Sequence, residues 1–212
     1  MAVKRNTESR KQPSQERSKK MVEKILKATR EVLLKDGVDG LSTRKIAAQA
    51  GISTGSLYQY FPNKLAVVKA IYSACLEDVI SDLEVLVDIP PMSIGEFMET
   101  LDTRLDRFYT PEKYSESSPD RAFELELFKA MNIFKELREI DEQHERNVVN
   151  VLANGLAKVF VDQSPDNLLR VSTYLYGIHT AFDEILVAGI CESAPLLIPH
   201  KKAMVAVIQT LE

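Results

Sequence analysis

Residues 41–64 read LSTRKIAAQAGISTGSLYQYFPNK, and this stretch decides the fold because it holds the start and stop signals of two short helices. Ser42 and Ser53 each precede a short run with one apolar face, where a serine hydroxyl can accept free backbone N–H groups of a first helical turn. Gly51 supplies a turn between the runs, and Pro62 ends the second because proline disfavours helical geometry in the residue before it. We therefore predict two short helices, at residues 43–50 and from Ser53 to about Tyr60.

Longer helices are predicted on both sides of this stretch. Apolar residues recur with helical spacing from Val22 to Leu33, and Gly37 is expected to end that helix as a C-terminal cap. A second long pattern starts at Asn63 and continues to the Pro-Pro pair after residue 89. One helix followed by two short helices around a glycine turn is the helix-turn-helix arrangement, whose second short helix enters the major groove of DNA.

The next part of the chain predicts two or three further helices. Ser93 and Glu96 have the spacing of a capping box, which opens a helix. Residues 110–120 are expected to form a loop because they are rich in serine, proline and charge. Residues 121–161 keep a helical pattern, with a break near Asn132 as one alternative.

The last part predicts two more helices and completes an all-α fold. Ser164 and Pro165 signal a helix that runs to about Gly189, and Pro199 is expected to open the final one. We find no pattern of paired strands. The expected organisation is a flexible basic arm (1–17), a helix-turn-helix domain (18–64) that extends into a linking helix (63–88), and a second helical domain (89–212).

Charge is divided unevenly along the chain. The net charge is -4, but residues 1–64 contain 14 Lys and Arg against 6 Asp and Glu, whereas the remainder contains 13 against 25. A basic end predicts contact with nucleic acid or an anionic surface, and the alternative is a solvated tail without a partner. The same two alternatives apply to the arm: its Lys and Arg side chains either contact DNA or the arm stays disordered.

Composition argues against a membrane protein and against an enzyme. No apolar run approaches the roughly 20 residues of a membrane span, and the basic N-terminus has no secretory pattern, so we expect a cytoplasmic protein. Cys75 and Cys191 are interpreted as reduced thiols rather than a disulfide or metal site. The sequence has no nucleophile motif, phosphate-binding glycine loop or metal-ligand cluster. We therefore expect no catalytic activity, no cofactor and no metal.

Residues 41–64 closely resemble the DNA-binding motif of the tetracycline-repressor (TetR) family of bacterial transcription regulators. The resemblance covers about residues 18–80, and the rest of the chain is similar only in being a string of helices of suitable length. It implies a helix-turn-helix DNA-binding domain followed by a variable helical domain for effector binding and dimerisation. The implied function is a repressor that binds a palindromic operator as a dimer and is released by a small, largely apolar effector.

The resemblance also implies which residues contact DNA. Gln59 is the best candidate for reading a base, because its amide can pair bidentately with adenine. For Tyr58 and Tyr60 the alternative is that the rings only pack against the first helix, the one that contains Val22 to Leu33. The implied DNA-binding residues, including phosphate contacts at both ends, are Thr43, Arg44, Ser53, Thr54, Gly55, Ser56, Tyr58, Gln59, Tyr60 and Lys64.

Members of the family dimerise so that two recognition helices meet half-sites roughly 34–36 Å apart. The expected dimer surface lies on the helices at about 165–189 and 199–212. The first is apolar on more than one face and carries small residues, Gly177, Ala181 and Ala188, that would let a partner approach closely. The alternative is a helix buried inside one subunit.

A small-molecule effector is expected in the second domain, with the long helix from Asn63 as the coupler to the DNA-binding helices. Aromatic walls with few polar groups are common in ligand sites, although each such residue can equally be plain core. The candidate ligand residues are Phe97, Leu101, Leu105, Phe108, Phe123, Phe128, Met131, Phe134, His144 and Tyr174.

The competing interpretation of the whole chain is a helical protein-interaction adaptor with secondary DNA binding.

Overall fold

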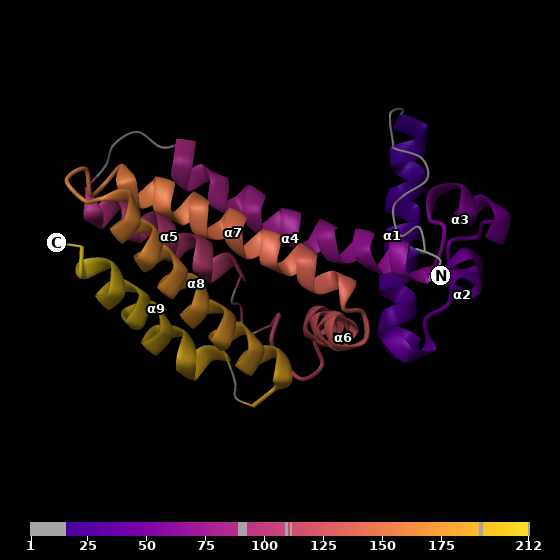
Figure 1. Cartoon of the computed structure of the whole chain (residues 1–212). Helices are drawn as coiled ribbons and strands as arrows, with labels where there is room; N and C mark the ends of the chain where they lie inside the picture. Colours follow the sequence, from indigo (N-terminus) through magenta and orange to yellow (C-terminus); the bar gives the residue numbers. More distant parts are fainter. Residues whose placement is uncertain (1–15, 89–92, 109, 111, 191–192, 212) are drawn as a thin grey trace. The chain divides into compact units, whose positions relative to one another are not determined.

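The computed structural model of the chain describes residues 16–88, 93–108, 110, 112–190 and 193–211. These ranges form nine α-helices and contain no strand (Figure 1). The helices are α1 (Glu16–Gly40), α2 (Thr43–Gln49), α3 (Thr54–Tyr60), α4 (Lys64–Asp88), α5 (Ile94–Phe108), α6 (Pro119–Ile133), α7 (Glu136–Ala157), α8 (Pro165–Ala188) and α9 (Ser193–Gln209). The predicted all-α class is therefore confirmed. No helix in the described ranges is both long and apolar enough to cross a membrane.

Four helices begin at the predicted side-chain caps. The hydroxyls of Ser42, Ser53 and Ser164 accept hydrogen bonds from the backbone N–H three residues later, which satisfies donors that the first turn leaves open. Ser93 and Glu96 bond to each other's backbone N–H groups, as a capping box does. Local sequence therefore predicts these four helix starts correctly.

Two helix bounds differ from the prediction. Helix α1 continues to Gly40, although Gly37 has the left-handed φ of 68 with a ψ of 173 and kinks the helix there. The last helix begins at Ser193, and Pro199 lies inside it rather than opening it. A proline seven residues into a helix removes one backbone hydrogen bond, and the turn before it supplies the helix start instead.

The chain forms two compact units, which we describe separately. The first contains the described residues up to Cys75 together with Phe123–Ile140, and the second contains Leu76–Ala122 with the residues from Asp141 on. The expected domains follow the chain, whereas the observed first unit also takes in most of α6. Helices α4, α6 and α7 each have residues in both units.

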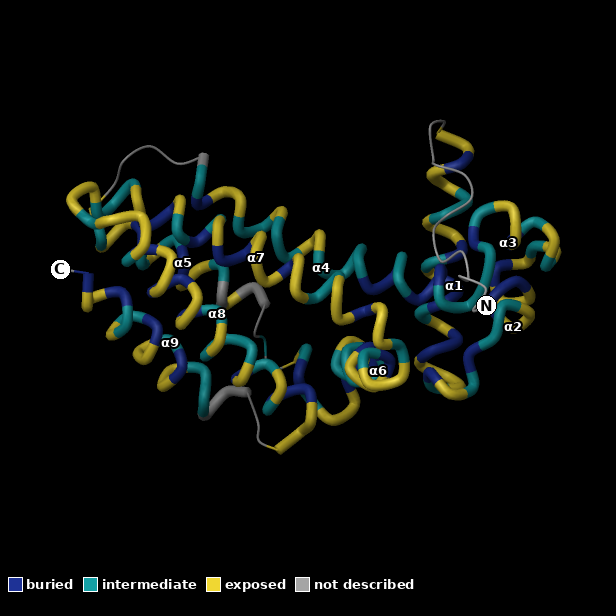
Figure 2. Tube along the Cα trace, in the orientation of Figure 1, coloured by how far each residue is buried: buried dark blue, intermediate teal, exposed yellow. Residues whose placement is uncertain are grey.

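Each unit has its own buried core (Figure 2). Large side chains with almost no exposure fill both cores, as expected where apolar faces of amphipathic helices meet. In the first unit they are Ile25, Leu33, Ile46, Leu57, Phe61 and Leu137, and in the second they are Leu86, Phe97, Leu156, Leu175, Leu186 and Ile208.

Candidate nucleic-acid interface

The turn between α2 and α3 is fixed by backbone hydrogen bonds. The N–H of Ile52 donates to the carbonyl of Ala47 at 3.0 Å, and the N–H of Gly51 donates to Ala48 at 3.1 Å. Gly51 has φ 59, a left-handed conformation that glycine adopts without a steric penalty. The two short helices therefore leave the turn in a defined orientation, with α2 packed on both α1 and α3.

Buried anchors decide which face of α3 is left outside. Leu57 is fully buried and Phe61 is 1% exposed, so the helix is held by these two positions. Tyr58 and Gln59, the two residues that follow Leu57, are therefore on the exposed side, together with Gly55 at the helix start. This is the surface that a helix-turn-helix unit presents to the major groove.

Hydrogen bonds order several of the predicted DNA-contact side chains. The hydroxyls of Thr43, at the start of α2, and Tyr58, on α3, are 3.1 Å apart and hydrogen-bonded. Ser53 Oγ lies 2.9 Å from Ser56 Oγ and also accepts the N–H of Ser56. The Tyr58 side chain is 39% exposed, so its ring is not enclosed in the core.

The remaining predicted contacts lie at the edges of this surface. Arg44 is exposed, whereas Thr54 and Tyr60 are half-buried. Lys64 is the first residue of α4, and its Nζ lies 5.4 Å from the centroid of the Phe134 ring, within cation–π range. Asn63 Oδ1 accepts the N–H of Ala66 at 2.9 Å, which fixes the beginning of that helix.

A charged pair holds α1 to α2 beside the interface. Lys45 Nζ lies 2.9 Å from Asp36 Oδ2, and this hydrogen bond lowers the pKa of the Asp36 carboxyl. Both groups are accessible to solvent, so the pair contributes little to stability. It reduces the positive charge that Lys45 presents at the surface of α2, and leaves Arg44 as the cation on that turn.

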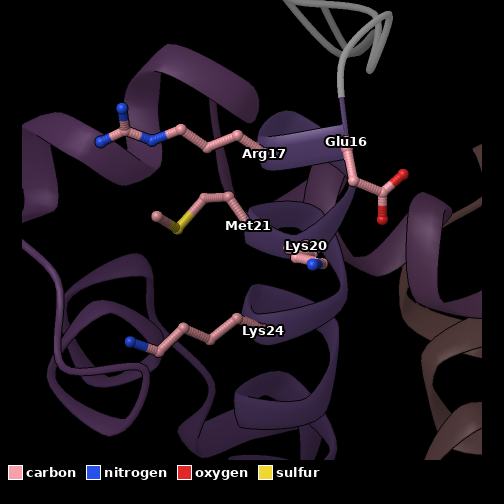
Figure 3. Close-up of a pocket in the computed structure, with 5 residues that line it drawn as sticks. All are labelled: Glu16, Arg17, Lys20, Met21 and Lys24. Carbon is pink, nitrogen blue, oxygen red and sulfur yellow. The ribbon is translucent and has the colours of Figure 1, made fainter.

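A basic groove lies at the N-terminal end of α1. It has a volume of about 460 Å³ and is lined by Glu16, Arg17, Lys20, Met21 and Lys24. Arg17, Met21 and Lys24, at helical spacing, extend to the same side of α1, whereas Glu16 points away from them (Figure 3). The sequence singled out the basic residues of the arm but not this groove, because it depends on which side of a helix each residue faces.

The candidate ligand residues are divided between the two units. Phe97, Leu101, His144 and Tyr174 belong to the second unit, and the first two are buried while Tyr174 is 61% exposed. The side chains of Leu105 and Phe108 lie outside what the structure describes. Phe123, Phe128 and Met131 of α6, and Phe134 just after that helix, belong to the first unit with the DNA-binding helices.

The contacts of α6 within the first unit explain that grouping. Phe123 lies under the guanidinium of Arg30, 4.2 Å from Cζ to the ring centroid, and Met131 Sδ accepts a hydrogen bond from the Tyr72 hydroxyl at 3.1 Å. Glu126, which looks like a helix-surface charge in the sequence, bonds to the backbone of α1. In the sequence, the local signal for this bond to α1 is the presence of an acidic residue within a largely apolar helical pattern.

Comparisons with known proteins agree with this geometry. Residues 25–71 match the model described as "Bacterial regulatory proteins, tetR family", and all ten predicted DNA-contact residues fall in this range. A stretch of 54 residues is 39% identical to the tetracycline repressor protein class A from transposon 1721 of Escherichia coli. That match spans 26% of this chain and 25% of the repressor, so the chain aligns with only about a quarter of this relative.

Solved structures resemble the chain over most of its length. A candidate TetR-family transcriptional regulator from Mesorhizobium loti is 18% identical, with a TM-score of 0.65 over 93% of this chain and 97% of that one. SmeT, the repressor of a Stenotrophomonas maltophilia multidrug efflux pump, is 19% identical, with a TM-score of 0.59 over 90% of this chain and 87% of that one. At these identities the likeness is one of fold.

Proposed function

This chain belongs to the TetR family of bacterial regulatory proteins, and from that premise we propose that it binds a palindromic DNA operator as a homodimer and is released by a small effector. Regulators of this family act on DNA rather than as enzymes. Two of the similar proteins are named as repressors, which supports repression as the direction of control.

The observation that carries the proposal is the exposed surface of α3. Tyr58 and Gln59 lie outside the core, and Arg44 is exposed at the start of the neighbouring helix. An amide side chain and a guanidinium at this position can read a base edge and hold a phosphate, respectively. The bond between Tyr58 and Thr43 orders these two side chains on the same surface, which lowers the entropy cost of binding.

The proposed DNA contacts divide by role. Gln59 is assigned to base reading, and Thr43, Arg44, Tyr60 and Lys64 to phosphate contacts that set the position of the helix. Lys64 combines its own charge with the positive dipole end of α4, where backbone N–H groups favour an anion. The other members of the proposed set, on or beside the recognition helix, are Ser53, Thr54, Gly55, Ser56 and Tyr58.

The outer face of α8 supports dimerisation. Tyr174, Gly177, Ala181 and Ala188 share this exposed face, and a Cβ placed on Gly177 would meet no described atom outside its own helical turn within 4 Å. Ile198 on α9 is also 63% exposed. Helices that expose apolar and small residues together suit a close two-fold contact between identical subunits.

A selection of duplex sites from a random pool at low ionic strength tests the regulator proposal. We expect a palindromic site to be enriched, and Gln59→Ala to weaken its binding by about 5- to 150-fold, equivalent to roughly 1–3 kcal/mol for a bidentate base contact. Gln143→Ala, an exposed glutamine on α7, is the matched control and should bind normally.

Two outcomes of that selection would contradict the proposal. Failure to enrich any duplex would favour the protein-interaction adaptor instead. If a duplex is enriched but Gln59→Ala and Gln143→Ala lose affinity for it equally, the protein binds DNA and Gln59 does not read a base.

A further inference from the structure

One face of α8 carries polar side chains into the interior of the second unit. Ser172, Tyr176, His179 and Asp183 follow at spacings of four, three and four residues, which places them on a single side of the helix. Ser172 is fully buried and the other three are half-buried. Polar groups in such a position cost stability unless they find hydrogen-bond partners.

Neighbouring elements present complementary groups at two points along this face. The hydroxyl of Tyr114, itself 6% exposed, donates a hydrogen bond of 3.0 Å to Asp183 Oδ1. His144, on α7 and 8% exposed, meets the ring of Tyr176 edge-on with the centroids 6.5 Å apart.

Helix α9 contributes at a third point. The ring of His200 lies 5.7 Å from that of His179 and stacks on Phe182, with the centroids 4.0 Å apart and the planes 9° apart. Planar rings from three helices and the α5–α6 connection thus surround the polar face.

Two buried atoms at this face lack a hydrogen-bond partner in the described part of the chain. They are Nδ1 of His144 and Oγ of Ser172, each with less than 1 Å² accessible to solvent. Most buried polar atoms in folded proteins are hydrogen-bonded, so such exceptions indicate a group that serves something other than the fold. Both atoms are closed off from solvent, so a molecule can reach them only after the groups that cover this face move.

Most side chains of this face are uncharged at neutral pH. Burial lowers the pKa of His144, and lowers those of His179 and His200 to about 4, so the three imidazoles are neutral. Burial also raises the pKa of Tyr176 to about 12. Burial raises the pKa of Asp183 as well, the positive charge of Lys113 acts on this carboxyl, and the negative charges of Asp141 and Glu145 act on Tyr176. The face therefore offers hydrogen bonds and ring surfaces in a largely buried setting, where an unpaired charge on a ligand would be costly.

We propose that this face of α8 binds the effector, and that the effector is an uncharged, planar small molecule with hydroxyl, carbonyl or amide groups. The inference rests on the proposed function for the role of the ligand, and it replaces the largely apolar effector expected from the sequence. A ligand that binds only after this face opens favours one arrangement of the chain over another, as a releasing effector must.

The stability of the full chain gives the first test. Ser172→Ala removes a hydroxyl that has no partner, so the melting temperature should rise by about 1–4 °C. Ser118→Ala is the control, because the buried Ser118 hydroxyl accepts the backbone N–H groups of Asp120 and Arg121, and its loss should lower the melting temperature. A lower melting temperature in Ser172→Ala would overturn the proposal, since the hydroxyl would then be serving the fold.

Thermal shifts with matched ring compounds give the second test. Benzamide should raise the melting temperature by roughly 2–4 °C at millimolar concentration, more than toluene, benzoate or benzylamine, which share its ring. Ser172→Ala and His144→Phe should each reduce the benzamide shift by at least half. An equal shift with toluene or with a charged relative, no shift with benzamide, or an unchanged shift in both variants would overturn the proposal. Neither measurement uses DNA, so failure here is separate from failure of the regulator proposal.

Discussion

The carboxylate of Glu126 on α6 accepts a hydrogen bond of 2.7 Å from the backbone N–H of Val38 on α1, 88 residues earlier in the chain. The bond forms where Gly37 interrupts the helical backbone of α1, which leaves this N–H without a regular helical partner. Glu126 Oε1 also pairs with Lys129 Nζ at 2.6 Å. Glu126, from the middle of the chain, thus supplies a hydrogen-bond acceptor near the C-terminal end of α1, the first helix of the DNA-binding domain.

Removing that carboxylate should destabilise the protein. Glu126→Ala leaves the N–H of Val38 unsatisfied in a part-buried position, and we expect a loss of about 1–3 kcal/mol in the free energy of unfolding. Urea denaturation measures it. Glu142→Ala, at an exposed position of α7, should change the free energy by less than about 0.5 kcal/mol. Equal midpoints for the two variants would show that the Glu126 bond contributes nothing.

Gly37 should be intolerant of any side chain. Its φ of 68 is strained for other residues, and an added Cβ would lie 3.2 Å from Glu126 Oε2. Gly37→Ala is therefore expected to cost about 1–3 kcal/mol of stability. Gly95→Ala on α5, where the added Cβ would meet only Ser93 Oγ at an ordinary contact distance of 3.9 Å, should be neutral or gain up to about 1 kcal/mol. Calorimetric melting of both variants measures the contrast, which disappears if α1 can straighten at residue 37.

Gly177 should control assembly without affecting the fold of one subunit. A Cβ at this position meets nothing within 4 Å in the chain, and glutamine favours a helix over glycine by roughly 0.5–1 kcal/mol. Gly177→Gln should therefore keep or raise stability per subunit but convert dimers to monomers, as seen by sedimentation velocity. Gly95→Gln serves as the control and should remain dimeric. A dimeric Gly177→Gln protein would move the interface away from this face.

The groove on α1 should contribute to DNA affinity through charge alone. If Arg17 and Lys24 neutralise phosphates beside the half-site, Arg17→Ala and Lys24→Ala will each reduce the slope of log K against log salt by about 0.9. The measurement is a titration of the selected duplex at several salt concentrations. Lys202→Ala, exposed on α9, should leave the slope unchanged. Unaltered slopes in all three variants would place the groove outside the DNA contact.

Stability should fall on acidification because of a buried imidazole. Burial lowers the pKa of His179 from 6.5 to about 4, so the unfolded chain takes up this proton at a higher pH than the folded chain does. The contribution is fully present above pH 6.5 and is lost as the pH falls towards 4, by on the order of 2–3 kcal/mol. The neighbouring His200 acts in the same direction.

A variant separates this effect from other groups. Asp183 has a raised pKa and acts in the opposite direction, because its folded form takes up a proton first as the pH falls. His179→Asn should flatten the dependence of the unfolding free energy on pH between 6.5 and 4, measured by urea denaturation at several pH values. The same slope in the variant and the parent would mean that His179 is accessible in the folded state.

Local signals in the sequence predict several helix starts well. Ser42, Ser53 and the Ser93–Glu96 pair act within one helical turn, so their roles can be read without knowing the rest of the fold.

The parts that escape prediction depend on distant contacts. Glu126 looks like an ordinary surface charge until α6 is placed against α1, and the polar side of α8 is hidden in a sequence that is apolar on average. Pro199 looks like a helix start because proline favours the first turn, but the preceding residues already form one. Contacts between helices that are far apart in the sequence decide the roles of Glu126 and of the polar side of α8. The residue pattern of a single helix does not reveal such contacts.

The hydroxyl contact between Thr43 and Tyr58 ties a residue outside the recognition helix to one inside it. Re-engineering the protein for a new operator by exchanging Tyr58 alone would therefore also release the Thr43 side chain, for which we propose a phosphate contact. Libraries aimed at new target sites should randomise the two positions jointly, since the best amino acid at either one depends on its companion.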